Sequence, residues 1–110
     1  MLAKKRFVRI ITMKAKRGRG DEFLKRFREG VAKTAGEIEG MRRLYLLRPV
    51  GKNDEFVAIS LWDDGKAAEK YARSGRNKQY GEKLAAVQEG KEKVKKFSVE
   101  LHVVGEQVED

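Results

Sequence analysis

The chain has 110 residues, of which 40% are apolar and 39% are charged, with a formal net charge of +9 and no cysteine. This length fits one domain that buries its own core, and apolar runs recur throughout, which argues against disorder. The lack of cysteine excludes disulfides, thiolate metal sites and cysteine nucleophiles. No stretch is apolar enough to predict a membrane span, and no apolar leader follows the basic N-terminus, so we expect a cytoplasmic protein.

The basic charge has three interpretations, which the sequence leaves open. A basic chain can bind nucleic acid, it can attract a small anion, or its charges can form a solvated surface in which acids and bases are interspersed. One stretch contains no acid, and it runs from Lys4 to Arg19. The rest of the chain mixes both signs.

Residues 7–15 are predicted as the first strand. Apolar side chains fall on both of its faces, which indicates that both faces are covered. One face carries Phe7, Arg9, Ile11 and Met13, with Arg9 as an interruption, and the other carries Val8 and Ile10.

A helix is predicted over residues 21–34, with Asp21 as its N-cap after a glycine-containing turn. Apolar residues recur through this segment at helical spacing. They are Phe23, Leu24, Phe27, Val31 and Ala35.

Two further strands are predicted over residues 41–48 and 55–62, joined by a hairpin-type loop. Pro49 ends the first of them, because proline cannot donate to a strand ladder. Trp62 ends the second, and it shares a face with Phe56, Ala58 and Ser60.

The last part of the chain is predicted as two helical pieces and a strand. Ser74 and Gly75 separate a short helix that follows Trp62 from a second piece over residues 77–88. Apolar and polar residues alternate over 97–104, which predicts a half-buried strand. An acidic tail over residues 105–110 follows.

The order strand–helix–strand–strand–helix–strand is that of the ferredoxin-like α+β fold, in which two helices cover one face of a four-stranded antiparallel sheet. We expect one domain over residues 1–110 with its core at about 7–104. The strands carry apolar residues on both sides, and a bare apolar sheet face is too large a patch for a monomer. The sequence therefore predicts a homodimer that packs sheet against sheet.

Several segments carry a resemblance to a known family when they are taken in order. They are the first strand with the Lys/Arg–Gly turn after it, residues 23–27, the Gly40–Met41 pair that leads into residues 46–49, residues 56–62, and a small helix that ends at Ser74. Together they resemble the antibiotic-biosynthesis-monooxygenase type of dimeric α+β barrel, and within it a heme-degrading branch. The resemblance covers about residues 7–104.

The heme-degrading branch implies three pocket residues: a tryptophan that ends the third strand, an asparagine on the first strand, and an iron-ligating histidine on the second helical piece. Trp62 matches the tryptophan. The asparagine position falls on Ile11, and the histidine position falls at or next to Gly81. The single histidine, His102, lies on the predicted last strand. Heme is the one candidate cofactor, and Tyr80 is then the nearest side chain for the iron.

Small residues beside Trp62 leave space above the sheet, which either helix side chains fill or a pocket occupies. On the pocket interpretation, Trp62 is the catalytic residue. The substrate-binding residues are Phe23, Phe27, Tyr71, Asn77 and Tyr80.

Two glycines sit inside the predicted helices, Gly30 and Gly81. Each costs about 1 kcal/mol relative to alanine in a helix interior. Both fall on the face that points towards the sheet. Close helix–sheet packing and room for a flat ligand explain them equally well.

Three functions remain open. The first is a small monooxygenase acting on an aromatic or heme-like substrate, which itself supplies the electrons if no metal is bound. The second is a non-catalytic module of the same fold that binds heme or another planar anion. The third, and least favoured, is nucleic-acid binding through residues 4–19, since the aromatic RNA-binding signature is absent from residues 55–59.

Overall fold

The structure is a computed structural model that describes residues 5–106. The strands and helices of this part of the chain follow one another in the order that the sequence predicts. The elements are β1 (Phe7–Lys14), α1 (Gly20–Phe27), the π-helical turn η1 (Arg28–Ala32), the 3-10 turn η2 (Ala35–Glu37), β2 (Met41–Leu47), β3 (Glu55–Trp62), α2 (Gly65–Ala72), α3 (Gly75–Ala85) and β4 (Lys93–Ser98).

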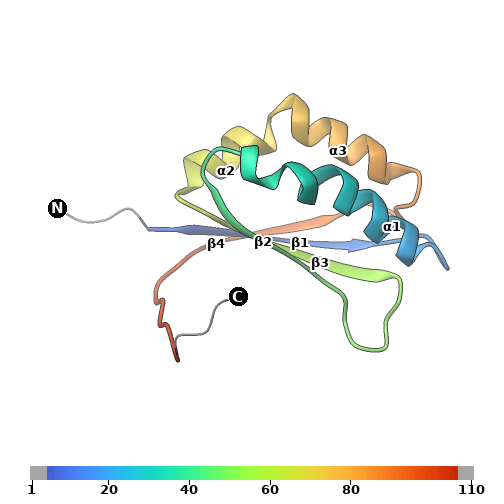
Figure 1. Cartoon of the computed structure of the whole chain (residues 1–110), viewed down its shortest axis with the longest axis horizontal. Helices are drawn as coiled ribbons and strands as arrows, with labels where there is room; N and C mark the ends of the chain where they lie inside the picture. The colour runs from blue at the N-terminus through green and yellow to red at the C-terminus, as the bar shows by residue number, and fades with distance from the viewer. Residues whose placement is uncertain (1–4, 107–110) are drawn as a thin grey trace.

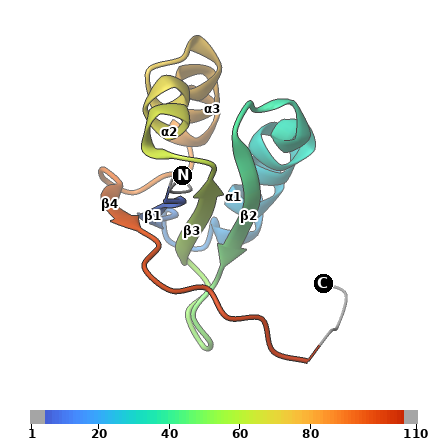
Figure 2. The same ribbon diagram turned by 90° about the vertical axis from the view of Figure 1, so that its left-hand side faces the viewer.

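The strands form one antiparallel sheet in the order β2-β3-β1-β4. The helices lie side by side on one face of this sheet (Figure 1). Seen end on, no helix of residues 5–106 lies on the other face (Figure 2). The predicted ferredoxin-like α+β fold is therefore confirmed.

The start of α1 is fixed from a distant loop. Asp21, the predicted N-cap, lies instead in the first turn, because the helix already begins at Gly20. The carboxylate of Asp54 takes the capping role and accepts hydrogen bonds from the N–H groups of Gly18 (3.0 Å) and Gly20 (3.1 Å). A Cβ at Gly20 would collide with the carbonyl oxygen of Asn53, so only glycine fits there. The β2–β3 loop thus also positions the first helix.

The predicted helix over residues 21–34 is not uniform. Its regular part ends at Phe27, and the π-helical turn η1 follows. Gly30 lies in this turn, and a Cβ there would approach Cδ1 of Tyr80 to 3.2 Å. Close packing against the Tyr80 ring therefore explains this glycine.

The second helical region is divided where the sequence predicts. Asp64 caps α2 by accepting from the Ala67 N–H at 2.9 Å. Ser74 caps α3 by accepting from the Asn77 N–H at 3.1 Å. Helix α3 ends at Ala85 and not at the predicted residue 88. The two caps satisfy donors that would otherwise lack partners at the helix starts.

The predicted last strand, over residues 97–104, is wrong in position. Strand β4 is Lys93–Ser98, and residues 99–106 leave the sheet on the side without helices (Figure 2). The lysine-rich run that resembles a helix end pairs with β1, where Arg9 lies opposite Lys96. Lysines are common on edge strands because they discourage pairing with other chains. Every residue of β4 is exposed, so the half-buried pattern is also wrong here.

The strand register assigns each side chain to one of the two sheet faces. On the helix side, the cross-strand rows are Leu44–Ser60–Arg9–Lys96 and Leu46–Ala58–Ile11–Val94. On the other side, they are Arg43–Leu61–Val8–Phe97 and Tyr45–Ile59–Ile10–Lys95.

The core lies on the helix side in two clusters. The larger is centred on Phe23 and Phe56, whose rings stack with centroids 4.7 Å apart. The smaller contains Ile38, Trp62 and Ala68. Residues from both clusters line the cavity described next.

Candidate functional site

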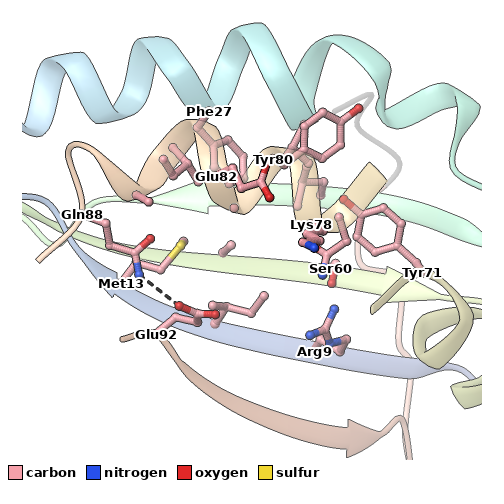
Figure 3. A pocket seen from close by; sticks show the side chains of 18 of the residues that line it. Arg9, Met13, Phe27, Ser60, Tyr71, Lys78, Tyr80, Glu82, Gln88 and Glu92 are labelled. Atoms are coloured by element: carbon pink, nitrogen blue, oxygen red, sulfur yellow. Dashed lines mark hydrogen bonds between the residues drawn. The ribbon is translucent and has the colours of Figure 1, made fainter. Parts of the chain in front are cut away.

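A cavity of about 490 Å³ lies between the sheet and helix α3, with the η1 region as a further wall (Figure 3). Its lining is largely apolar and comes from β1, β2, β3, α1, η1, α2, α3 and the segment before β4. Ala58 and Ser60 form part of the floor. The space above these small residues is therefore a pocket, and helix side chains do not fill it.

Trp62 lies in the wall of this cavity and is 1% exposed. Its indole Nε1–H donates to Oγ of Ser60 at 2.8 Å. The rings of Trp62 and Tyr71 approach with centroids 5.4 Å apart and planes tilted by 36°. The indole N–H is thus already engaged, and the ring is the part of Trp62 that is left to face the cavity.

Ser60 lies between Trp62 and the cavity and contacts both. Its hydroxyl oxygen accepts from the indole, and it makes no hydrogen bond as a donor to any of the residues 5–106. A hydroxyl has one donor and two acceptor sites. The Ser60 O–H is therefore free to donate into the cavity.

Arg9 is the charged group on the cavity floor, directly opposite Ser60 in the β1–β3 register. It is 9% exposed, and its Nε has no hydrogen-bond partner within residues 5–106. Its guanidinium points up towards Ser60 and the cavity (Figure 3). In the sequence, Arg9 only interrupts the apolar face of β1, and it was therefore not predicted as a site residue.

The two tyrosines in the lining differ in how their hydroxyls are used. Burial raises the pKa of Tyr71 to about 12; the nearby Tyr80 adds to the rise, and the Arg9 and Arg76 charges oppose it. Tyr71 is therefore a neutral phenol at physiological pH. The Tyr80 hydroxyl is hydrogen-bonded to Thr34, so Tyr80 offers mainly its ring to the cavity.

The other predicted substrate-binding residues divide between wall and core. Phe27 and Asn77 line the cavity, and the Asn77 side chain also donates to the carbonyl oxygen of Ala72 at 3.0 Å. Phe23 does not belong to the lining; it is fully buried and stacks on Phe56. Phe23 thus supports the floor from the core.

Both positions that the heme-degrading branch implies, Ile11 and Gly81, do line the cavity. A Cβ at Gly81 would meet no atom within 4 Å, so this glycine leaves open space. His102 does not belong to the cavity lining and lies in the exposed segment after β4. The positions are therefore in place, but the asparagine and histidine side chains are missing.

No metal site is present in the part of the chain that the structure describes, because no group of three His, Asp or Glu side chains could hold an ion there. Within the same residues, no helix is long and apolar enough to cross a membrane.

The basic stretch over residues 4–19 does not form one continuous surface in its described part. Arg9 is buried in the cavity floor. Lys5 pairs with Glu100 at 2.6 Å, and Arg19 pairs with Glu22. Lys14, Lys16 and Arg17 are exposed, so the described basic residues of this stretch are divided between the cavity floor, ion pairs and the exposed surface.

Residues 6–93 match the model of the family described as antibiotic biosynthesis monooxygenase. The chain therefore belongs to the antibiotic biosynthesis monooxygenase family. The resemblance that the sequence gives to this family is confirmed. No curated protein sequence matches the chain.

Several solved structures share the fold. SnoaB, a cofactor-independent oxygenase from Streptomyces nogalater, is 19% identical with a TM-score of 0.78, over 90% of this chain and 97% of that one. A conserved protein from Methanosarcina mazei is 12% identical with a TM-score of 0.75, over 86% of this chain and 93% of that one. A protein of unknown function from Nitrosomonas europaea is 9% identical with a TM-score of 0.78, over 96% of this chain and 100% of that one.

Proposed function

We propose that the chain is a small monooxygenase that oxidises a planar, electron-rich aromatic substrate inside the cavity on the helix side of the sheet. The observation that carries this proposal is the cavity itself, about 490 Å³ with largely apolar walls and the Trp62 ring in its lining. Ligand sites of this size and polarity suit flat apolar molecules. Membership of a monooxygenase family supports the reaction class.

A phenol can supply all the electrons for such a reaction. With 1-naphthol, one atom of dioxygen adds to the ring carbon para to the hydroxyl. The hydrogens of that C–H and of the phenolic O–H leave with the second oxygen atom as water, and the ring becomes a quinone. Carbon loses four electrons and dioxygen gains four, so no external reductant is needed.

The residues of the chain would bind and orient the ring and limit its contact with water. Trp62 and Tyr71 offer tilted aromatic surfaces at one end of the cavity, against which a substrate ring can pack. Phe27, Asn77 and Tyr80 complete the wall. Phe23 holds the floor in place through its stacking with Phe56.

Oxygen uptake with 1-naphthol tests this function. We expect uptake with one isotopically labelled oxygen atom in the naphthoquinone when the reaction is run under labelled dioxygen. Gly81→Trp should abolish turnover, since a side chain at Gly81 has open space to enter the cavity. Gln79→Trp, at an exposed position of the same helix, is the matched control and should retain it. Full turnover by Gly81→Trp would remove the cavity as the site.

Binding of a planar anion without catalysis is the second candidate, and the unpaired Nε of Arg9 favours it. The donor set argues against heme held by an axial ligand: His102 lies outside the lining and the Tyr80 hydroxyl is bonded to Thr34. Heme therefore takes no part in the proposed reaction. A hemin titration is expected to leave the Soret band unshifted, and a stoichiometric shift would favour the heme-binding alternative.

We further infer that two copies associate through the sheet face that carries no helix within residues 5–106. Exposed or half-buried apolar side chains from all four strands lie there. Tyr45, Leu47 and Phe97 are between 44% and 46% exposed. Two such faces can pack about 10 Å apart and bury each other's apolar rows. The lack of cysteine fits our expectation that this homodimer works in the cytoplasm.

A further inference from the structure

Arg9 is a buried cation on a central strand. It is 9% exposed, and its Nε has no hydrogen-bond partner within residues 5–106. A buried charge is costly unless it is paired and hydrogen-bonded. Arg48 also has an Nε without a partner, but its guanidinium pairs with Asp21 at 3.2 Å and lies over the Phe56 ring. Arg9 has no comparable compensation among these residues.

The carboxylates near Arg9 are engaged elsewhere or lie at the mouth. Glu69 accepts a hydrogen bond from Lys96, the cross-strand neighbour of Arg9, at 2.7 Å. That bond is the largest cause of the lowered pKa of Glu69, and the Arg9 charge is the smallest. Glu82 and Glu92 are exposed, and Glu92 accepts from Gln88 at 3.1 Å. No carboxylate within residues 5–106 therefore pairs with the guanidinium.

Other hydrogen-bond donors point at the same place. The Ser60 hydroxyl lies opposite Arg9 and has a free O–H, because its oxygen already accepts from Trp62. Lys78 reaches into the cavity from α3, and its ammonium group points towards Ser60 (Figure 3). A guanidinium, a hydroxyl and an ammonium from three different elements form a donor-rich corner. Such a corner suits an oxyanion.

The geometry of the guanidinium indicates which oxyanion binds there. Its planar fork matches the two oxygens of a carboxylate, and such pairs are stronger than neutral hydrogen bonds. Most of the remaining lining is apolar and aromatic, and its charged side chains, Glu82, Lys91 and Glu92, are exposed to solvent. The buried part therefore suits a ring and not a second charge. Resting on the proposed function of this cavity, we propose that the substrate is an aromatic acid whose carboxylate binds Arg9 and Ser60 while its ring occupies the apolar part.

Calorimetry with two ligands of one shape tests this subsite, because 2-naphthoate and 2-naphthamide differ mainly in charge. We expect the wild-type chain to bind 2-naphthoate about 10- to 100-fold more tightly than the amide, the range of one or two hydrogen bonds to a charged group. Arg9→Met should remove this preference, and Arg9→Lys, which keeps the charge without the planar fork, should retain only part of it.

Lys95→Met is the matched control, since it removes one positive charge from the opposite face of the sheet. It should leave both affinities unchanged. Equal binding of the two ligands by the wild type, or an unchanged preference in Arg9→Met, would overturn the subsite. An equal loss in Lys95→Met would do the same, because it would show general attraction to a basic chain.

Unfolding without ligand gives an independent readout. Replacing an unpaired buried charge by an apolar residue of similar volume is often neutral or stabilising, so Arg9→Met should unfold at the same or a higher temperature. A markedly lower midpoint would mean that Arg9 has a partner in the free protein, against the subsite. Preference for 2-naphthoate without turnover of either 1-naphthol or its carboxylated form, 5-hydroxy-2-naphthoate, would leave the subsite standing and remove the oxygenase. Turnover without a preference for 2-naphthoate over 2-naphthamide would support the oxygenase and remove the carboxylate subsite.

Discussion

The two faces of the sheet are both apolar in sequence, but they differ in what they lack. The helix side is covered, yet it keeps a cavity with the buried cation Arg9 on its floor. The other side has no charge at its centre, where Ile59 lies opposite Ile10, and no helix of residues 5–106 covers it. The covered face, with its cavity and buried charge, suits binding of a small ligand. The bare apolar face suits contact with another protein surface.

Matched phenylalanine truncations give the largest expected effect. Phe56 on the helix side is 1% exposed and stacks on Phe23, and Phe97 on the other side is 46% exposed. Phe56→Ala should cost about 3–5 kcal/mol of unfolding free energy, because it leaves a cavity in a packed core. Urea unfolding at several protein concentrations measures both variants.

Phe97→Ala should cost much less, and its cost should change with protein concentration if Phe97 lies in a dimer interface. The Phe56→Ala penalty should not change in this way. Equal penalties for the two variants at every concentration would contradict the distinction between the faces.

A charge at the centre of the bare face should separate the two copies. Ile59→Lys places an ammonium between Tyr45 and Ile10, where it would be desolvated in a sheet-to-sheet interface at a cost of several kcal/mol. Sedimentation should then give a monomer, while Gln79→Lys on the exposed side of α3 should remain a dimer. A wild-type chain that sediments as a monomer would contradict the interface.

The fold could be predicted from local patterns wherever the side chains of a strand alternate clearly between two faces, as over residues 55–62. The errors came from contacts between distant parts of the chain. Asp54 caps a helix that starts 34 residues earlier, and the lysine-rich β4 is recognisable as a strand only from its pairing with β1. Neither contact leaves a local signal.

The site was also predictable only where its residues form a local pattern in the sequence. Trp62 beside Ala58 and Ser60 is a local pattern that indicates space above the sheet, and the cavity lies there. Arg9 looks like a flaw in an apolar face, because its burial depends on how the helices cover β1. Lys78 gives no signal in the sequence, since a lysine on a helix is ordinarily solvated.

The two helix glycines, which the sequence treats alike, give the smallest expected effect. Gly81→Ala should stabilise the chain by about 0.5–1 kcal/mol, because alanine favours a helix interior and its Cβ would meet nothing within 4 Å. Gly30→Ala should gain less or destabilise, since its Cβ would lie 3.2 Å from Cδ1 of Tyr80. Thermal unfolding of both variants measures the difference. A gain at Gly30 as large as that at Gly81 would mean that the Tyr80 ring moves freely, and that packing does not explain the glycine in η1.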